Sequence, residues 1–288
     1  MPMTDERKQE LLKQVMDCRL QQDFVVLEDM HLVPLLNTEY VSQYFYIGLC
    51  RRGRTLGHYD YKPTDFKAGD ICWLMPDHVV SHHSVTDDYS VLSVFITREY
   101  FQRLKERGVL GKYHYLHHTP LISLTPSQFD TIYQAFQLLG RLAESDSPHR
   151  DSMIASLIGI ISTMGDEFVR LHVPDISQKT LLHEDLFERF LDAVVRHHCE
   201  SREVKFYADL LALTPKYFAT VIKRTTGLAA SEWINRYVMV EAKWLLRSQR
   251  QKSIQQIALH LGFSEQASFS RFFKGYEGLS PREFRERE

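Results

Sequence analysis

The chain has 288 residues, a length that suits two domains with separate hydrophobic cores. With 44% hydrophobic residues, 25% charged residues and a formal net charge of −2, it has the composition of a soluble globular protein. No apolar run approaches the roughly 18 residues that span a bilayer, and the charged start MPMTDERKQE speaks against a signal peptide. The scattered cysteines form no CxxC pair, which speaks against a zinc site or a disulfide framework. We expect a cytoplasmic protein without a membrane partner.

The first half of the sequence contains short segments with strand character. Residues 40–49, 55–61, 71–74 and 91–96 are rich in aromatic and β-branched residues and are separated by turn residues. Strands this short at this spacing predict a small β-barrel or sandwich within residues 24–96.

Helical periodicity begins near residue 97. Thr125, Pro126 and Gln128 provide an N-cap, a proline in the first turn and a capping-box partner, and an apolar stripe follows at helical spacing. A second helix is expected over residues 152–171. Residues 173–183, which include Pro174, are the predicted linker between a domain of residues 1–172 and an all-helical domain of residues 184–288 with seven helices.

The last hundred residues contain one short pattern twice, about fifty residues apart. The first copy runs from Tyr207 to Leu213 and the second from Ile257 to Phe263, and each is followed by a second helix. A small alanine occupies the point where two helices of a helix-turn-helix approach most closely. Gly262 can adopt a positive φ in the second turn, whereas Ala212 stands there in the first copy, where we expect a different or mildly strained turn.

Each second helix has an apolar face for packing and a small, polar or basic face. Thr214 and Ser264 are the expected N-caps of these helices, and Gly227 is the expected stop of the first. An exposed face of this kind suits a DNA major groove. The expected DNA-contacting residues are Lys216, Tyr217, Ala219, Thr220, Lys223 and Arg224 in the first helix, and Gln266, Ala267, Ser268, Ser270, Arg271 and Lys274 in the second.

Charge and spacing support this interpretation. Residues 204–274 hold eleven Lys and Arg against four Asp and Glu, as expected for a segment that binds a polyanion. The helix expected over residues 230–248 would be roughly 27 Å long, which holds two recognition helices near the roughly 34 Å between successive major grooves.

At these residues the chain resembles the AraC/XylS family of transcription regulators. The resemblance covers residues 184–288 and is most specific at 213–218, 241–246, 257–264, 271–274 and 279–285. It implies contacts with bases by Lys216, Ala219 and Thr220 and by Gln266, Ala267, Ser270 and Arg271, and it implies RNA polymerase as a partner. One departure is Val238, where many relatives carry an arginine.

The strand-rich first half is similar to the cupin-like sensor domain of that family. Gly69, Asp70, Pro76 and His82 resemble a cupin half-motif, but the HxH pair of a metal-binding cupin is absent, since residues 48–61 offer only His58. The adjacent pairs His82–His83 and His117–His118 would point to opposite faces of a strand. We expect no metal, no cofactor and no catalytic residue.

Aromatic residues gather in this half, either as barrel core or as the lining of a pocket for a small effector. The predicted effector-binding residues are Arg54, Tyr59, Trp73 and His82.

The resulting expectation is an α+β protein with a cupin-like β-barrel, flanking helices and an all-α double helix-turn-helix domain. It would be a dimeric regulator that binds double-stranded DNA and responds to an unknown effector, and not an enzyme. Two alternatives stay open: a constitutive regulator whose N-terminal half only dimerises, and a metal-cupin enzyme fused to a DNA-binding module.

Overall fold

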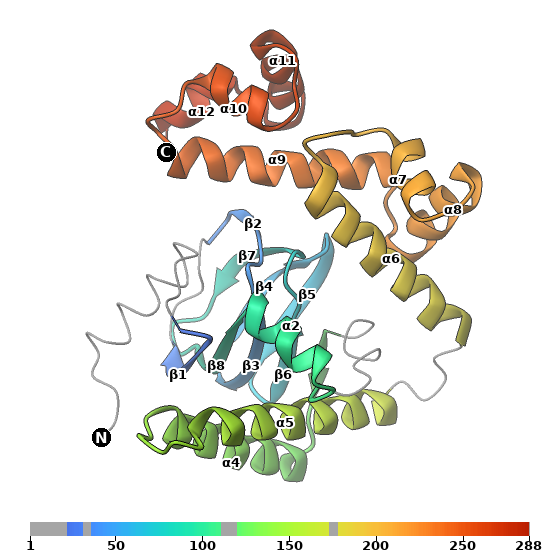
Figure 1. The fold of residues 1–288 in the computed structure, drawn as a ribbon. Coiled ribbons are helices and arrows are strands. Elements are labelled where there is room, and N and C mark those ends of the chain that lie inside the picture. The colour runs from blue at the N-terminus through green and yellow to red at the C-terminus, as the bar shows by residue number, and fades with distance from the viewer. Residues whose placement is uncertain (1–21, 31–35, 111–119, 173–177, 288) are drawn as a thin grey trace. The chain divides into compact units, whose positions relative to one another are not determined.

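The computed structural model describes residues 22–30, 36–110, 120–172 and 178–287 (Figure 1). The chain forms two compact units, Met1–Leu181 and Leu182–Glu288. The N-terminal unit combines antiparallel sheets with helices and the C-terminal unit is helical, so the protein has the expected α+β organisation.

Nine described strands build two antiparallel sheets in the N-terminal unit. The five-stranded sheet has the order β1-β8-β3-β6-β9 and the four-stranded sheet the order β2-β7-β4-β5. Their bounds are β1 Phe24–Met30, β2 Glu39–Val41, β3 Tyr44–Arg52, β4 Arg54–Tyr59, β5 Lys62–Lys67, β6 Asp70–Leu74, β7 Val79–Val85, β8 Ser90–Thr97 and β9 Leu121–Ser123. The expected confinement of strands to residues 24–96 is wrong for β9, which pairs with β6.

The five-stranded sheet buries both of its faces. On β3, Phe45, Ile47 and Leu49 belong to the core on the helical side, while Tyr44 and Tyr46 belong to the cluster between the sheets. This alternation follows from the two-residue period of a strand. A sheet covered on both sides explains why its strands are apolar at almost every position.

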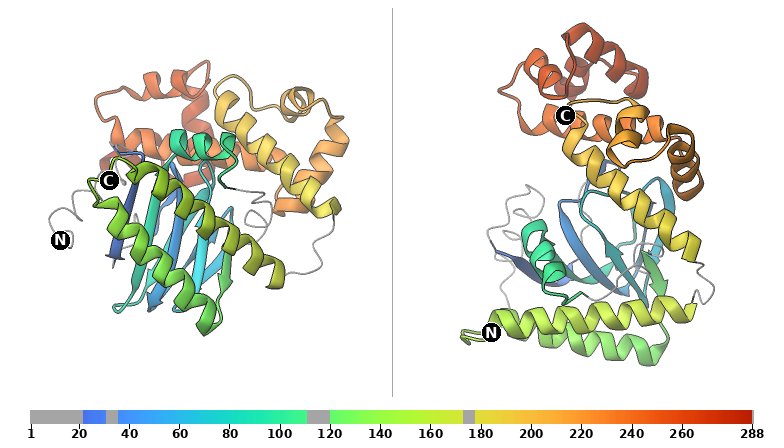
Figure 2. Two further views of the ribbon diagram at one scale, coloured as in Figure 1. Left: turned by 60° about the horizontal axis from the view of Figure 1, so that its bottom comes forward. Right: turned by 45° about the vertical axis from the view of Figure 1, so that its right-hand side comes forward.

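Three helices cover the outer face of this sheet: α2 (Arg98–Glu106), α4 (Pro126–Ala143) and α5 (Arg150–His172) (Figure 2). The capping box predicted at Thr125 and Gln128 is confirmed, with Pro126 in the first turn. Helix α5 is long and apolar enough to cross a membrane by composition alone, with a mean hydropathy of 1.3. Ten of its residues are buried against the sheet and the neighbouring helices, as is typical of a core helix in a soluble protein.

The C-terminal unit contains seven helices within the described residues. They are α6 Gln178–His197, α7 Val204–Leu210, α8 Pro215–Thr226, α9 Ala230–Ser248, α10 Ile254–His260, α11 Gln266–Glu277 and α12 Pro281–Arg287. The second half of the expected linker therefore belongs to α6. The first helix-turn-helix consists of α7 and α8, and the second consists of α10 and α11.

The two turns share one backbone conformation. Ala212 has φ +57° and Gly262 has φ +73°, and both turns close with a hydrogen bond from the following residue to the small alanine, Leu213 N to Ala208 O and Phe263 N to Ala258 O, each 2.9 Å. Ala212 therefore adopts the left-handed conformation at a cost of about 1 kcal/mol, rather than changing the turn.

The helix caps differ between the two copies. Thr214 caps α8 as predicted, and its side chain accepts a hydrogen bond from the Tyr217 amide. The second turn is one residue longer, so the N-cap of α11 is Glu265 and the predicted cap Ser264 is wrong. Both helices stop at a left-handed glycine, Gly227 with φ 81° and Gly278 with φ 78°.

Helix α9 contributes to two hydrophobic cores. Its first half carries Trp233, which packs on Phe187 of α6 with ring centroids 5.2 Å apart. Its second half carries Val238, Ala242 and Leu246, which are fully buried with the second helix-turn-helix. The valine at position 238, where the resemblance implied an arginine in many relatives, is therefore a core residue.

The segment after α6 holds a buried ion pair. His198 Nε2 lies 2.6 Å from Glu241 Oε2 of α9, and its Nδ1 lies 3.0 Å from the Val194 carbonyl oxygen. Both ring nitrogens thus face acceptors, an arrangement that the protonated imidazole satisfies by donating from each. Burial lowers the pKa of His198, but its hydrogen bonds with Cys199 and Glu241 outweigh this and raise the pKa to about 10.

This ion pair predicts a pH-dependent stability of the C-terminal unit. Because the folded pKa of about 10 lies above the ordinary value of 6.5, the stabilisation is complete below pH 6.5 and is lost as the pH rises through 10. In calorimetry between pH 6 and pH 10, the wild type should lose stability more steeply than His198→Gln. The exposed His260 provides a control, and His260→Gln should keep the wild-type slope. Equal slopes for the wild type and His198→Gln would contradict this prediction.

Candidate nucleic-acid interface and effector site

The exposed face of α8 carries basic and polar side chains. Phe218, Val221 and Ile222 are buried and fix the orientation of the helix. The opposite face carries Lys216, Tyr217, Thr220, Lys223 and Arg224, all exposed, with Ala219 half-buried between the two faces. Lys216, Lys223 and Arg224 form no ion pair with the part of the chain that the structure describes, so their charges face solvent.

The exposed face of α11 repeats this arrangement. Phe269 and Phe273 are buried, whereas Phe272 is half-buried at the edge of the core. The opposite face carries Gln266, Ala267, Arg271 and Lys274, exposed, and Ser268 and Ser270, half-buried. The structure therefore places all twelve predicted DNA-contacting residues on two accessible helix faces.

Corresponding positions on the two helices carry different chemistry. Lys223 and Lys274 are each the ninth residue of their helix, and each peptide oxygen accepts a 2.9 Å hydrogen bond from the capping glycine. Thr220 corresponds to Arg271. The Thr220 hydroxyl donates to the Lys216 carbonyl oxygen at 2.8 Å, while Arg271 Nη2 reaches only Ser268 Oγ at 3.4 Å. The arginine is thus the side chain with more freedom to meet a ligand.

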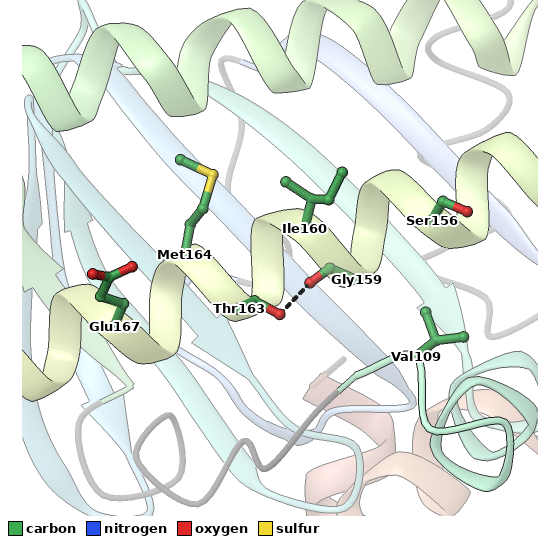
Figure 3. Close-up of a pocket in the computed structure, with 7 residues that line it drawn as sticks. All are labelled: Val109, Ser156, Gly159, Ile160, Thr163, Met164 and Glu167. Carbon is green, nitrogen blue, oxygen red and sulfur yellow. Dashed lines mark hydrogen bonds between the residues drawn. The ribbon is translucent and has the colours of Figure 1, made fainter.

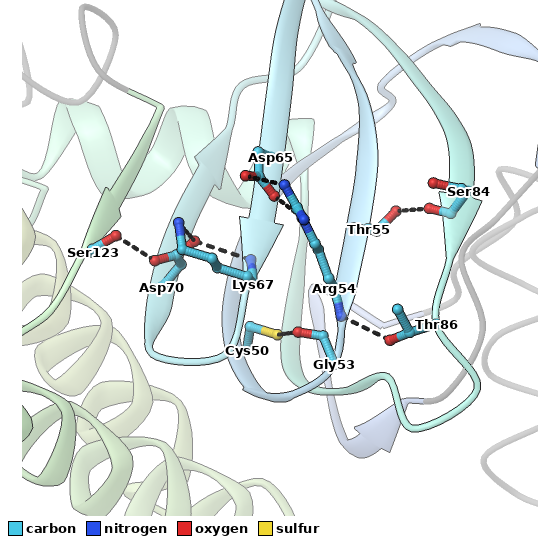
Figure 4. A network of polar contacts seen from close by, with 10 residues as sticks. All are labelled: Cys50, Gly53, Arg54, Thr55, Asp65, Lys67, Asp70, Ser84, Thr86 and Ser123. Carbon is cyan, nitrogen blue, oxygen red and sulfur yellow. Dashed lines mark hydrogen bonds and ion pairs between the residues drawn. The ribbon is translucent and has the colours of Figure 1, made fainter.

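The four predicted effector-binding residues do not come together. Tyr59 and His82 lie on the face of the four-stranded sheet that looks toward the other sheet. Arg54 lies on the outer face, where its Nε and Nη2 contact the Asp65 carboxylate at 2.5 and 2.7 Å (Figure 4). Trp73 lies on the helical side of the five-stranded sheet, where an added Cβ on Gly165 of α5 would be 2.3 Å from the indole.

Hydroxyl-bearing side chains, none of them among the predicted effector-binding residues, lie in the layer between the sheets. The Tyr46 ring lies over Gly48, where an added Cβ would be 2.5 Å from its hydroxyl oxygen, and this hydroxyl lies 3.1 Å from Ser93 Oγ. His82 Nε2 lies 3.3 Å from Tyr40 Oη, and its Nδ1 lies 3.4 Å from Thr55 Oγ1. Burial lowers the pKa of His82 to about 4, so the ring is neutral at physiological pH.

The histidines form no metal cluster in the described residues. His82 points inward while its neighbour His83 points outward, and His83 Nε2 lies 2.6 Å from His58 Nδ1. No group of three or more His, Cys, Asp or Glu side chains suited to a metal ion occurs among these residues. His117 and His118 lie outside the described residues.

A shallow groove runs along the exposed side of α5 (Figure 3). Ile160, which is 53% exposed, and Met164 contribute apolar surface, and Thr163 and Glu167 line one side. Gly159 allows the Val109 backbone to approach α5 closely at one side of the groove, because an added Cβ would lie 2.7 Å from the Val109 carbonyl oxygen.

Comparison with known families assigns both halves of the chain. Residues 39–159 match the AraC-like ligand binding domain, and residues 207–287 match a helix-turn-helix domain. Similar proteins include the Msm operon regulatory protein of Streptococcus mutans, 26% identical over 133 residues, which are 46% of each chain. The transcriptional activator RhaS of Escherichia fergusonii is 34% identical over 90 residues, 31% of this chain and 32% of its own. The chain thus spans less than half the length of these relatives.

Among solved structures, ToxT from Vibrio cholerae with a bound unsaturated fatty acid is similar in fold. The alignment has a TM-score of 0.53 at 15% identity and covers 92% of this chain and 97% of ToxT. A ligand-binding domain of the AraC type precedes a helix-turn-helix domain in this order on one chain, and the protein therefore belongs to the AraC family of transcription regulators.

Proposed function

We propose that this protein is a sequence-specific DNA-binding transcription regulator that responds to a small effector. The observation that carries the proposal is the structural repeat of α8 and α11, two capped helices with buried aromatic faces and accessible basic faces. A helix of this kind fits the major groove, where its side chains reach base edges and flanking phosphates.

The spacing between the two helix-turn-helix units supports binding to two major grooves. Helix α9 has 19 residues, and at a rise of 1.5 Å per residue its first and last residues are about 27 Å apart. Successive major grooves on one face of B-DNA are about 34 Å apart. Residues 204–274 hold eleven Lys and Arg against four Asp and Glu, and this excess of positive charge would attract the DNA phosphates.

Lys223 and Lys274 would bind phosphates, while Arg271 would read a base. The two lysines occupy equivalent positions near the helix ends, and their flexible ammonium groups suit the backbone. Arg271 projects from the second turn of α11, and its guanidinium can donate two parallel hydrogen bonds to guanine.

The proposed effector site lies between the two sheets, and the side chains there favour an uncharged ligand. Among the described residues, no lysine or arginine is buried in this unit, and His82 is neutral. Arg54, one of the predicted effector-binding residues, faces outward and is paired with Asp65. The inward hydroxyls of Tyr40, Tyr46 and Thr55 favour a hydroxyl-bearing ligand. In this respect the site would differ from that of ToxT, which binds a fatty acid.

We further propose that the protein is a homodimer with the exposed side of α5 in its interface. Ile160 and Met153 are 53% and 36% exposed on this helix, and Leu138 on neighbouring α4 is 41% exposed. Ile160 lines the groove, and exposed apolar side chains on such a surface are typical of a face that a partner covers. Contact with RNA polymerase stays a prediction of the family resemblance.

The DNA roles are tested with a duplex selected from random sequence by the full-length protein. Arg271→Ala should lose about 1–3 kcal/mol of discrimination at one base pair, while Lys223→Ala should weaken binding to every sequence alike and reduce the salt dependence. Affinities for the selected duplex and its single-base variants, measured at several salt concentrations, distinguish the two roles. A uniform loss for Arg271→Ala would contradict its role in base reading.

The effector proposal is tested by thermal unfolding of the full-length protein with sugars, other neutral polyols, phenols and carboxylic acids that include a fatty acid. Neutral compounds should raise the unfolding temperature of the N-terminal unit, and His82→Gln should remove this response. His83→Gln, on the same strand but facing outward, is the matched control and should respond like the wild type. Stabilisation by carboxylates alone would contradict an uncharged ligand, and a response unchanged by His82→Gln would contradict this site.

The dimer proposal is tested by Ile160→Glu. Because Ile160 is 53% exposed, the variant should keep its unfolding temperature within the small change typical of surface substitutions while its self-association weakens. Sedimentation velocity over a range of concentrations measures the association. Leu56→Glu, at a 39% exposed leucine of the four-stranded sheet, is the control. A monomeric wild type, or an Ile160→Glu variant that dimerises like the wild type, would refute the proposal.

A further inference from the structure

The segment between α6 and α7, residues 198–203, directly precedes the first helix-turn-helix in sequence but contacts the second. We call it the α6–α7 connector. The Arg202 guanidinium carbon lies 3.7 Å above the centre of the Phe263 ring and 5.6 Å from that of Phe272. Phe263 ends the turn of the second helix-turn-helix and Phe272 lies on its helix α11. One side chain of the connector therefore packs against the second helix-turn-helix.

The backbone of the connector also abuts the second turn. An added Cβ on Gly262 would lie 2.0 Å from the Cys199 carbonyl oxygen, so only glycine fits at this position. The equivalent residue of the first turn, Ala212, is exposed and carries a methyl group in the same left-handed conformation. The turn geometry alone therefore tolerates alanine, and the contact with Cys199 is the additional reason for glycine in the second copy.

A third contact joins the connector to the middle of α9, between the two hydrophobic cores to which this helix contributes. His198 pairs with Glu241 at 2.6 Å, and its ring packs against Tyr237 at 5.5 Å between centroids. Tyr237 and Glu241 flank Val238, the first residue of α9 in the second core. The connector thus touches both the helix that joins the two helix-turn-helix units and the turn of the second unit.

We infer that the α6–α7 connector is a brace that holds the two helix-turn-helix units at one fixed separation, with Arg202 as its principal positioning residue. Without the connector, the relative position of the two helix-turn-helix units would depend on α9 and on a surface contact between Tyr276 Oη and Glu232 Oε2, which are 3.2 Å apart. The cation–π contact of Arg202 joins the segment before the first helix-turn-helix to two aromatic residues of the second, so it acts on the relation between the two.

The brace itself is argued from contacts within the C-terminal unit, and only its expected effect on DNA affinity rests on the proposed function. A rigid pair of DNA-reading helices binds a site with the matching spacing far more tightly than either helix alone, because the second contact becomes intramolecular. A loosened pair gains less from the matched spacing but accepts other spacings more readily.

The first test needs no DNA. Nitroxide labels attached through a ketone-bearing amino acid replace Leu210 of α7 and Leu259 of α10, which are 48% and 55% exposed, in the full-length protein. Electron–electron double resonance should give one narrow distance distribution for the otherwise unchanged chain. Arg202→Ala and Gly262→Ala should broaden or shift it. Arg196→Ala, at an arginine whose side chain is 67% exposed on α6, and Ala212→Gly should not.

Distributions for Arg202→Ala and Gly262→Ala as narrow as that of the parent, in variants with unchanged circular dichroism, would overturn the brace. Arg202→Lys keeps a cation over the ring and should restore part of the narrow distribution even if Gly262→Ala fails to fold.

The second test uses the selected duplex with one to five base pairs inserted between its half-sites. The wild type should lose about 100-fold in affinity on insertion, the scale of lost avidity. Arg202→Ala should start about fivefold weaker on the uninterrupted site, as expected for one cation–π contact, but lose less than about tenfold on insertion. Equal insertion penalties would assign Arg202 a phosphate contact instead. If no duplex is selected, the proposed function fails while the distance measurement still decides the brace.

Discussion

The C-terminal unit depends on α9 being buried along two successive faces. Its first half closes a core with α6, α7 and α8, where Phe190 meets Tyr207 and Phe218 at 5.7 and 5.1 Å between ring centroids. Its second half closes the core of the second helix-turn-helix. One continuous helix thus sets the distance between α8 and α11, because a helix has a fixed rise per residue. The outward faces of both helices are free for a ligand because their inward faces complete these cores.

The N-terminal unit depends on a sheet that is buried on both faces. The five-stranded sheet is buried on one face by α2, α4 and α5 and on the other by the four-stranded sheet. Two glycines make the close approaches possible, Gly165 under the Trp73 indole and Gly48 under the Tyr46 ring. The large aromatic residues therefore divide between the two faces. Trp73 stabilises the helical layer, whereas the tyrosines and His82 provide the polar groups between the sheets, where we propose the effector.

The C-terminal helices were predictable from the sequence because their signals are local. Thr214, Pro215 and Gly227 mark the limits of α8, and the spacer expected over residues 230–248 is α9. The single extra residue before α11 moved its cap to Glu265, since nothing in the sequence fixes the length of that turn. The ion pair of His198 with Glu241 and the contact of Arg202 with Phe263 join residues far apart in sequence, and no local pattern reveals them.

The strands were harder to predict. Strand β7 reads VVSHHSV, too polar to resemble a strand, and β5 contains Pro63, which is tolerated because β5 lies at the edge of its sheet. The alternation along β6 separates Trp73 from Cys72, but a sheet buried on both faces gives no sequence signal for which face meets the helices. This is why Trp73 was assigned to the effector site.

The central claim is that the two helix-turn-helix units bind one face of DNA together. Hydroxyl-radical footprinting of the full-length protein on its selected duplex tests this most directly. The account predicts two protected patches per bound chain, about 10 base pairs apart on the same face of the helix. Protection of a single patch, or two patches on opposite faces, would contradict it.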